Sequence, residues 1–264
     1  MTVSRRAFHD VLKKSCFQAG EVILKNFGKK KKIQSKGIND WVTEIDFKAE
    51  NVIIKCIKKY FPESSFLAEE SGNSERRSEL HWIIDPIDGT NNYIHNHPFF
   101  SVSIALSIDG VISYSAVFDP LRKEFFFAEK GRGSFLNKKK IVVSNIKKLS
   151  ESLLCTGFIT SNKKYTEMNM RNFKKLIYYC QSIRRDGSAA LDLAYVASGR
   201  LDAFWVLGLN PWDTAAGVLL VKEAGGIVTK ANGKNYSIYD KSLLTSNQFL
   251  HKELIRNLKQ NSNL

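Results

Sequence analysis

The sequence predicts an α+β fold made of two tightly joined halves, residues 1–148 and 149–264. Three observations predict it: helical spacing of apolar residues before Pro62, a run of strand-like segments in the middle of the chain, and strands that alternate with helices after Leu149. With 264 residues, 43% of them hydrophobic, the chain is long and apolar enough to bury a core.

The N-terminal half opens with two predicted helices. Apolar residues recur near helical spacing from about residue 4 to residue 27, which predicts an amphipathic helix. A lysine-rich stretch follows and passes through residues 36–40, where polar and helix-breaking residues predict a loop. A second helical pattern covers residues 47–60, and Pro62 ends it because proline cannot continue a helix.

The middle of the chain predicts a β-sheet. Its apolar segments are short, and turn-forming residues such as Asp109-Gly110 separate them. We expect strands at residues 66–68, 82–84, 101–108, 111–118 and 124–128.

The C-terminal half predicts strands that alternate with helices. The predicted strands are residues 153–157, 203–207 and 227–229, and the predicted helices are residues 166–179, 188–198 and 214–224. Gly199 and the pair Gly225-Gly226 mark two of the helix ends, where glycine is common.

The apolar segments do not predict a membrane protein. The longest of them, residues 99–118, is interrupted by Asp109-Gly110, so we expect no membrane-spanning helix. Near the N-terminus, Lys13 and Lys14 interrupt the apolar run that a signal peptide needs. We therefore expect a cytoplasmic protein with no membrane partner.

The cysteines do not form a recognisable metal or disulfide pattern. Cys16, Cys56, Cys155 and Cys180 lie far apart, with no CxxC pair and no neighbouring histidine cluster. This spacing argues against a zinc site and against a disulfide framework. We expect reduced thiols in the core.

The chain is strongly basic, with 40 Lys and Arg against 26 Asp and Glu and a formal charge of +14. Such a balance raises the question of nucleic-acid binding. The basic residues are nevertheless scattered in short runs, such as residues 29–32, 138–140 and 163–164. We therefore expect nucleic acid not to be the main partner, and the charge can instead draw anionic phosphate esters toward a cleft.

Residues 82–90 carry the most informative pattern, a hydrophobic strand that runs into two acids separated by a rigid proline turn. The carboxylates of Asp85 and Asp88 and the carbonyl of Ile87 can converge on one point and offer the oxygen ligands that Mg²⁺ favours. If residues 90–92 open a helix, their N–H groups face the same point and can hold a phosphate. An ordinary Asp-Pro turn has the same pattern, so both interpretations stay open here.

Three further acids lie in similar positions. Glu69 follows a short apolar run, and the end of a strand is a usual place for a ligand, but a solvated loop acid is the alternative. Asp46 and Asp213 each precede a predicted helix, so each can be a plain N-cap.

Ordered motifs cover nearly the whole chain. They are Asp40-Trp41-Val42-Thr43-Glu44-Ile45-Asp46, Ala68-Glu69-Glu70-Ser71, Trp82 through Thr90 with Asn92, His95 and Pro98, Pro211 through Gly217, and Glu223-Ala224-Gly225-Gly226. In this order they resemble the inositol monophosphatase family of lithium-sensitive, metal-dependent phosphatases. The resemblance implies a layered αβαβα sugar-phosphatase-type fold, a homodimer, and a small phosphate monoester as substrate.

The resemblance also implies how the acids share their metal ions. Glu69, Asp85 and the Ile87 carbonyl would hold one Mg²⁺, and Asp85, Asp88 and Asp213 a second, with Asp85 as the bridge. A third, weaker ion would contact Glu69, and Mn²⁺ is a possible substitute. Without cations, the carboxylates would raise one another's pKa values by repulsion.

The same resemblance implies the catalytic and substrate-binding residues. Thr90, positioned by Asp46, would orient and help deprotonate the attacking water. The backbone N–H groups of Gly89 and Thr90 would bind phosphate. The implied substrate-binding set is completed by Asp88, Gly187, Ser188, Ala189 and Asp213.

One departure from the family pattern lies at Val206, where many inositol-hydrolysing relatives carry Glu. That Glu accepts hydrogen bonds from substrate hydroxyls, and Val cannot, so discrimination for inositol would fall by about 1–3 kcal/mol. Ala68, Asn91 and Asp186 are smaller departures that bear on loop shape.

The expected reaction is hydrolysis of inositol 1-phosphate, or a similar polyol phosphate, to alcohol and phosphate, with neither a covalent enzyme intermediate nor an organic cofactor. One alternative is a related phosphatase that acts on a 3′-phosphoadenosine nucleotide, fructose bisphosphate or a glycerol phosphate. Another is an RNA- or protein-binding regulator that keeps the fold, which the charge of +14 suggests.

Overall fold

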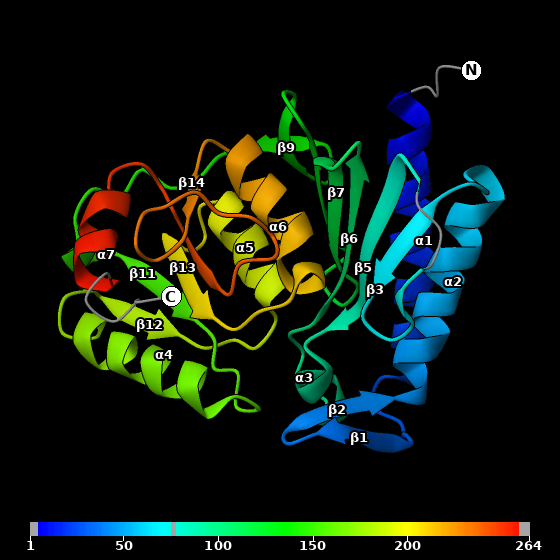
Figure 1. Ribbon diagram of the computed structural model, residues 1–264, viewed down its shortest axis with the longest axis horizontal. Coiled ribbons are helices and arrows are strands. Elements are labelled where there is room, and N and C mark those ends of the chain that lie inside the picture. Colours follow the sequence, from blue (N-terminus) through cyan, green and yellow to red (C-terminus); the bar gives the residue numbers. More distant parts are fainter. Residues whose placement is uncertain (1–4, 75–77, 259–264) are drawn as a thin grey trace.

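A computed structural model describes residues 5–74 and 78–258 and shows alternating layers of helices and sheets in the order αβαβα (Figure 1). This order confirms the predicted fold class. The layers are helices α1 (Arg5–Asn26) and α2 (Glu44–Tyr60), a large sheet, helices α5 (Ala189–Ala197) and α6 (Pro211–Glu223), a small sheet, and helices α4 (Lys163–Leu176) and α7 (His251–Leu258).

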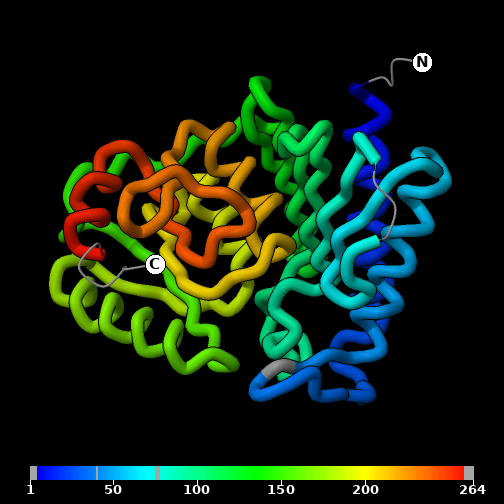
Figure 2. Tube along the Cα trace, in the orientation of Figure 1, coloured from blue at the N-terminus to red at the C-terminus, as the bar shows by residue number. Residues whose placement is uncertain are grey.

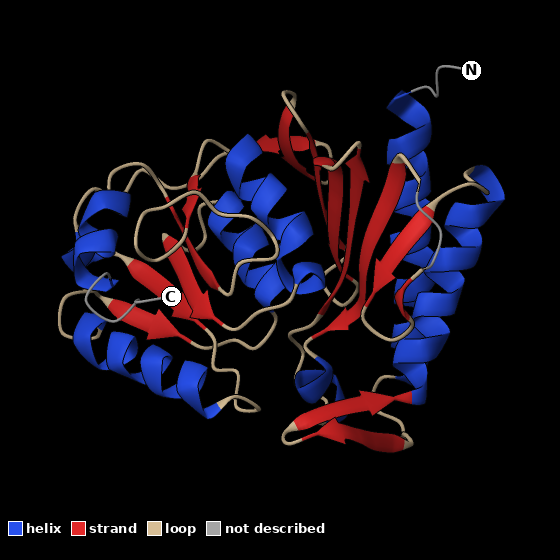
Figure 3. Cartoon of the chain, viewed as in Figure 1, coloured by secondary structure: helices blue, strands red, loops and turns tan. Residues whose placement is uncertain are grey.

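The outer helices α1 and α2 pack against each other and cover one face of the large sheet (Figure 3). Both confirm predicted helices, although the predicted start of α1 at residue 4 lies outside the described residues. Helix α2 begins earlier than residue 47 because Thr43 is its N-cap and Asp46 accepts the Thr43 N–H in a capping box. The interpretation of Asp46 as an N-cap is therefore wrong, since it occupies the third helical position.

The large sheet is mostly antiparallel and contains the predicted strands of the middle region. Its described strands are β3 (Ser65–Ala68), β4 (Gly72–Asn73), β5 (Leu80–Asp88), β6 (Ser101–Ile108), β7 (Val111–Asp119), β8 (Glu124–Glu129), β9 (Gly133–Leu136) and β10 (Lys139–Ile141). They lie in the order β10-β9-β8-β7-β6-β5-β3-β4, with β3 parallel to β5. As a result, β3 and β5 end at the same edge of the sheet.

Helices α5 and α6 fill the space between the two sheets and form the centre of the hydrophobic core that lies there. A side chain at Gly217 of α6 would collide with Leu193 of α5, so this glycine lets the two helices approach closely. Because the core joins residues from both sheets, the two halves of the chain share one interior.

The small sheet is mixed and lies between α5 and α6 on one side and α4 and α7 on the other (Figure 1). Its order is β12 (Ser182–Arg184), β11 (Leu153–Thr156), β13 (Ala203–Leu207), β15 (Ser242–Ser246) and β14 (Ile227–Thr229). A short 3₁₀ helix, η1 (Leu149–Glu151), precedes β11. The predicted strands at 153–157, 203–207 and 227–229 are confirmed within one residue.

A small hairpin covers the end of the large sheet at which β5 finishes. Strands β1 (Ile33–Gly37) and β2 (Asp40–Thr43) form it, so the predicted loop at residues 36–40 is wrong in part. Every residue of β1 is exposed, which explains why the strand shows no apolar alternation. The hairpin contacts the short helix α3 (Thr90–Ile94), and both lie at the same end of the molecule in the tube trace (Figure 2).

Among the described residues, no helix is long and apolar enough to cross a membrane. The cysteines are free thiols, as expected; Cys16, Cys56 and Cys155 are buried, and Cys180 is partly buried.

A buried histidine at the start of α7, packed against the small sheet, gives the fold a pH-dependent stability. His251 lies between Thr229 Oγ1, 2.9 Å from Nε2, and Ser246 Oγ, 2.7 Å from Nδ1. Burial lowers the pKa of His251 from 6.5 to about 4. Its contribution to the free energy of unfolding is therefore present above pH 6.5 and declines below it, because the unfolded chain takes up a proton that the folded chain does not.

Because of this histidine, we expect the free energy of unfolding to fall by about 2 kcal/mol when the pH is lowered from about 7 to about 5. Urea unfolding at the two pH values should show a larger loss for the wild type than for His251→Asn, whose side chain does not titrate. Equal losses in the two proteins would contradict the assignment.

Candidate active site

The site begins where β5 ends. Asp85 pairs with Ser103 of β6 and Asp88 with Ser101, and the register shifts between the two acids. Pro86 lies in this irregular segment, where a residue without an N–H is tolerated. The bulge gives Asp85 and Asp88 different surroundings although both belong to one strand.

Asp88 is held by the first turn of α5. Its carboxylate accepts hydrogen bonds from Ser188 Oγ, from the Ala189 N–H at 3.1 Å and from the Ala190 N–H at 2.7 Å. Burial raises the pKa of Asp88 to about 6, and these hydrogen bonds partly offset the rise. An acid of the large sheet is thus fixed by a helix from the other half of the chain.

Glu69, Asp85, Asp88 and Asp213 lie close enough to affect one another's ionisation; we call them the acid cluster. Burial raises the pKa of Asp85 well above its usual value, and the charges of the other members of the cluster raise it further. Burial and the charge of Glu69 likewise raise the pKa of Asp213. The structure therefore brings together the predicted metal-binding acids, and their mutual repulsion favours a bound cation.

Asp213 reaches the cluster from the start of α6. It accepts the Asn210 N–H at 2.7 Å and completes a capping box in which Asn210, not Asp213, is the N-cap. The N-cap interpretation is therefore wrong for Asp213 as well. The capping hydrogen bond uses Oδ2 and fixes the carboxylate at the helix start.

Lys36 of the β1–β2 hairpin contacts the cluster, which the sequence did not predict. Its Nζ lies 3.1 Å from Glu69 Oε1 and 2.7 Å from Glu70 Oε1. Within the lysine-rich stretch nothing distinguishes it from its neighbours; only the hairpin turns it toward Glu69. A cation thus already lies against one edge of the acid cluster.

Thr90 and Asp46 form the predicted pair. Thr90 Oγ1 lies 3.1 Å from Asp46 Oδ1 and 3.0 Å from the Ile87 carbonyl oxygen. The other oxygen of Asp46 accepts hydrogen bonds from the N–H and the hydroxyl of Thr43. Burial raises the pKa of Asp46, and the hydrogen bonds oppose this. The hydroxyl is thereby held at the start of α3.

The two halves of the chain meet at Gly89 and Gly187. Gly89 has φ +101°, and a Cβ there would lie 3.1 Å from the Phe99 carbonyl oxygen and 3.2 Å from that of Gly187. Asn92 joins the same segments, because its Nδ2 donates to the carbonyls of Phe99 and Asp186, each at 2.7 Å. Only glycine fits at position 89 without moving this junction.

A cavity of about 250 Å³ opens at this junction. It is lined by the predicted site residues Glu69, Asp88, Gly89, Thr90, Gly187, Ser188, Ala189 and Asp213. Asp46, Asp85 and Ile87 do not line it; Asp46 and Ile87 accept hydrogen bonds from the Thr90 hydroxyl, and Asp85 lies close enough to the other acids for their charges to raise its pKa. Val206 also lines the cavity, together with Arg185 and Asp192, which the sequence did not single out as binding residues.

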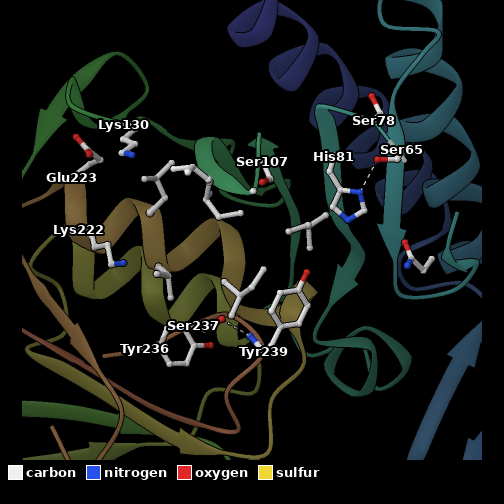
Figure 4. A pocket seen from close by; sticks show the side chains of 18 of the residues that line it. Ser65, Ser78, His81, Ser107, Lys130, Lys222, Glu223, Tyr236, Ser237 and Tyr239 are labelled. Carbon is white, nitrogen blue, oxygen red and sulfur yellow. Dashed lines mark hydrogen bonds between the residues drawn. The ribbon is translucent and has the colours of Figure 1, made fainter. Parts of the chain in front are cut away.

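A larger cavity of about 1160 Å³ lies near the other end of α6 (Figure 4). Its lining includes His81, Ser107, Lys222 and Tyr239, and His81 Nδ1 lies 2.8 Å from Ser65 Oγ. None of the predicted site residues lines this cavity. The acid cluster therefore places the candidate chemistry in the smaller one.

The chain is similar to known proteins along nearly its whole length. A model of the inositol monophosphatase family matches residues 5–263. The Nus factor SuhB of Escherichia coli is 42% identical over 92% of each chain. The inositol-1-monophosphatase of Synechocystis is 40% identical over 93% of this chain and 86% of its own length. The crystal structure of the extragenic suppressor protein suhB from Bartonella henselae has a TM-score of 0.92 and 36% identity and covers 96% of this chain and 99% of its own.

Proposed function

Because this chain belongs to the inositol monophosphatase family, we propose that it is a Mg²⁺-dependent phosphatase. Its proposed substrate is inositol 1-phosphate or a similar polyol phosphate, which it hydrolyses to the free alcohol and phosphate. The observation that carries the proposal is the acid cluster, of which Glu69, Asp88 and Asp213 line the 250 Å³ cavity beside Thr90.

The acid cluster fits Mg²⁺. All its side-chain donors are carboxylate oxygens, the ligands that this hard cation prefers. Burial and repulsion from the neighbouring acids raise the pKa of Asp85. A bound divalent cation would offset the repulsion and stabilise the ionised carboxylates. We propose that Glu69, Asp85 and the Ile87 carbonyl hold one ion and that Asp85, Asp88 and Asp213 hold a second. A third ion at Glu69 would have to displace Lys36, which lies 3.1 Å away.

When bound, Mg²⁺ would activate the attacking water and stabilise the alkoxide leaving group. The chain itself supplies a route for the proton. Thr90 can donate its single hydroxyl hydrogen to Asp46, and its oxygen can then accept a proton from the attacking water. The raised pKa of Asp46 makes it a better proton acceptor than an exposed aspartate. We therefore assign Thr90 and Asp46 to general-base catalysis.

The remaining cavity residues are proposed to bind the substrate. The N–H groups of Gly89 and Thr90 would bind phosphate at the start of α3. Gly187, Ser188 and Ala189, from the loop that meets them, would contact the alcohol. Asp88 and Asp213, which lie on opposite halves of the chain, would contribute to both metal and substrate binding.

A panel of phosphate esters tests the proposal. We expect phosphate release from inositol 1-phosphate or β-glycerophosphate with Mg²⁺, weaker or comparable release with Mn²⁺, inhibition by Li⁺, and no release after chelation. The panel should include fructose bisphosphate and a 3′-phosphoadenosine nucleotide, because both remain alternatives. A folded protein that releases no phosphate from any ester with either metal would refute the enzyme proposal.

Val206 is expected to weaken selectivity for inositol. Its side chain is buried in β13 and lines the cavity, where it offers no hydrogen-bond acceptor. Val206→Glu should raise kcat/KM for inositol 1-phosphate relative to β-glycerophosphate by about tenfold, since one hydrogen bond is worth about 1–3 kcal/mol. Val206→Met serves as the control, because it adds volume without an acceptor. An unchanged ratio in a folded Val206→Glu protein would contradict this role.

A regulator that binds RNA or protein is the second candidate function. It is favoured by the 42% identity to proteins called Nus factor SuhB and by the charge of +14. Measuring the affinity for RNA as a function of salt concentration tests whether the chain binds RNA specifically. A steep loss between low and physiological salt would indicate only nonspecific phosphate contacts.

A further inference from the structure

Beside the active-site cavity, the fold assembles a second group of possible metal ligands. Cys155 comes from β11, Asp186 from the loop before α5, and Asp192 from α5. The Cys155 Sγ and one carboxylate oxygen from each acid lie within 4.8 Å of one another. The wide spacing of the cysteines along the chain argued against a zinc site, but this group uses only one cysteine.

Asp192 is hydrogen-bonded to Cys155 within the group, but one of its carboxylate oxygens has no partner in the part of the chain that the structure describes. Its side chain is 2% exposed, and Oδ1 accepts no hydrogen bond from the described residues. Burying a carboxylate oxygen without a hydrogen bond is costly, so native structures supply a proton, a donor or a cation. Burial raises the pKa of Asp192 well above its usual value, and the charge of Asp186 raises it further. Arg185 acts on it only weakly.

We propose that Cys155, Asp186 and Asp192 form a second cation site, separate from the acid cluster, which binds a thiophilic divalent ion such as Zn²⁺. Sulfur is a poor ligand for Mg²⁺ and a good one for Zn²⁺, which proteins bind through thiolate, imidazole and carboxylate groups and, in open sites, water. The two sites would therefore select different metals.

The dimensions and charges suit such an ion. Ligand bonds of about 2.0–2.3 Å in a tetrahedral site place the ligand atoms about 3.5 Å apart, so small side-chain rotations would close the group around the ion. Asp192 lines the 250 Å³ cavity, through which the ion and a water ligand can enter. One thiolate and two carboxylates leave a net charge of −1 around a divalent ion, which the positive charge of Arg185 would reduce. Burial raises the pKa of the Cys155 thiol, so the ion displaces its proton on binding.

The site has a direct connection to the chemistry. Asp186 and Asp192 flank the segment 188–190, whose Ser188 hydroxyl and two N–H groups hold Asp88. An ion bound to both acids would tie the loop to the first turns of α5. Occupancy of this site would then fix the donors of Asp88.

Co²⁺ reports on the site without reference to activity, because a thiolate bound to Co²⁺ gives a charge-transfer band in the near ultraviolet. The wild-type protein is titrated with Co²⁺ in excess Mg²⁺, which occupies the acid cluster. We expect the band in the wild type and its loss in Cys155→Ser. In Asp192→Asn and Asp186→Asn we expect the affinity for Co²⁺ to fall by about tenfold or more. Cys180→Ser is the matched control and should keep the band.

The result separates this proposal from the phosphatase proposal, since neither the band nor its loss depends on turnover. Absence of a band in the folded wild type, or a band that survives in Cys155→Ser or disappears in Cys180→Ser, would overturn the second site. If Cys155→Ser does not fold by circular dichroism, the isosteric Asp192→Asn and Asp186→Asn variants decide, and unchanged Co²⁺ affinity in both would also overturn it.

Discussion

Asp88→Asn is expected to lower kcat/KM by about a thousandfold or more, because it removes a carboxylate from the proposed metal site and with it several kcal/mol of transition-state stabilisation. The substitution preserves shape, and the amide oxygen can still accept hydrogen bonds from Ser188 and the first turn of α5. The variant should therefore fold while losing activity, which phosphate release and circular dichroism measure together.

Asp119→Asn is the matched control for this variant. Asp119 is a buried acid at the end of β7 that accepts hydrogen bonds from the Leu121 and Arg122 N–H groups and pairs with the Arg122 guanidinium at 2.8 Å. Its replacement is expected to lower stability but to leave kcat near the wild-type value. A folded Asp88→Asn protein with activity within tenfold of the wild type would refute the metal role of Asp88.

Thr90→Val is expected to lower kcat by about a hundredfold to a thousandfold with little change in KM, because general-base catalysis contributes on this scale. Asp46→Asn should give a loss of similar size. The double variant should lose little more than either single variant, since both residues act in one step across a 3.1 Å hydrogen bond.

Thr245→Val tests whether loss of a buried threonine hydroxyl alone has this effect. Its Oγ1 lies 3.4 Å from the Phe204 carbonyl oxygen in the small sheet. We expect its kcat to stay near the wild-type value. Additive losses in the Thr90 and Asp46 variants would show that the two residues act independently and would contradict the proposed pair.

The elements that could be predicted from the sequence are those whose burial follows a regular period. Helix α1 buries residues at helical spacing, and β6 and β7 are long strands divided by a clear turn. Strand β1 is exposed throughout, β12 has three residues, and β15 is a short buried run flanked by serines. Pairing, and not local pattern, decides these strands: β1 pairs with the adjacent β2, and β12 and β15 pair with strands distant in sequence, so the sequence did not predict them.

The candidate site divides in the same way. Asp85, Asp88 and Glu69 could be singled out because they come at the ends of apolar segments and belong to the ordered family motifs; the parallel pairing of β3 and β5 then brings them to the same sheet edge. The contact of Lys36 with Glu69 could not, because it depends on the fold of an exposed hairpin. The group of Cys155, Asp186 and Asp192 was missed because its members become neighbours only when β11 and α5 pack together.

The hydrogen bonds that Ser188, Ala189 and Ala190 make to Asp88 have a consequence for partly folded chains. The first half carries Glu69, Asp85 and Asp88, yet the donors that orient Asp88 and the remaining acid, Asp213, belong to the second. A nascent or cleaved chain in which only one half is folded would therefore have no phosphatase activity, rather than reduced activity. Under the proposed function, turnover would therefore report whether the two halves are correctly docked, and it would be lost on misalignment before either half unfolds.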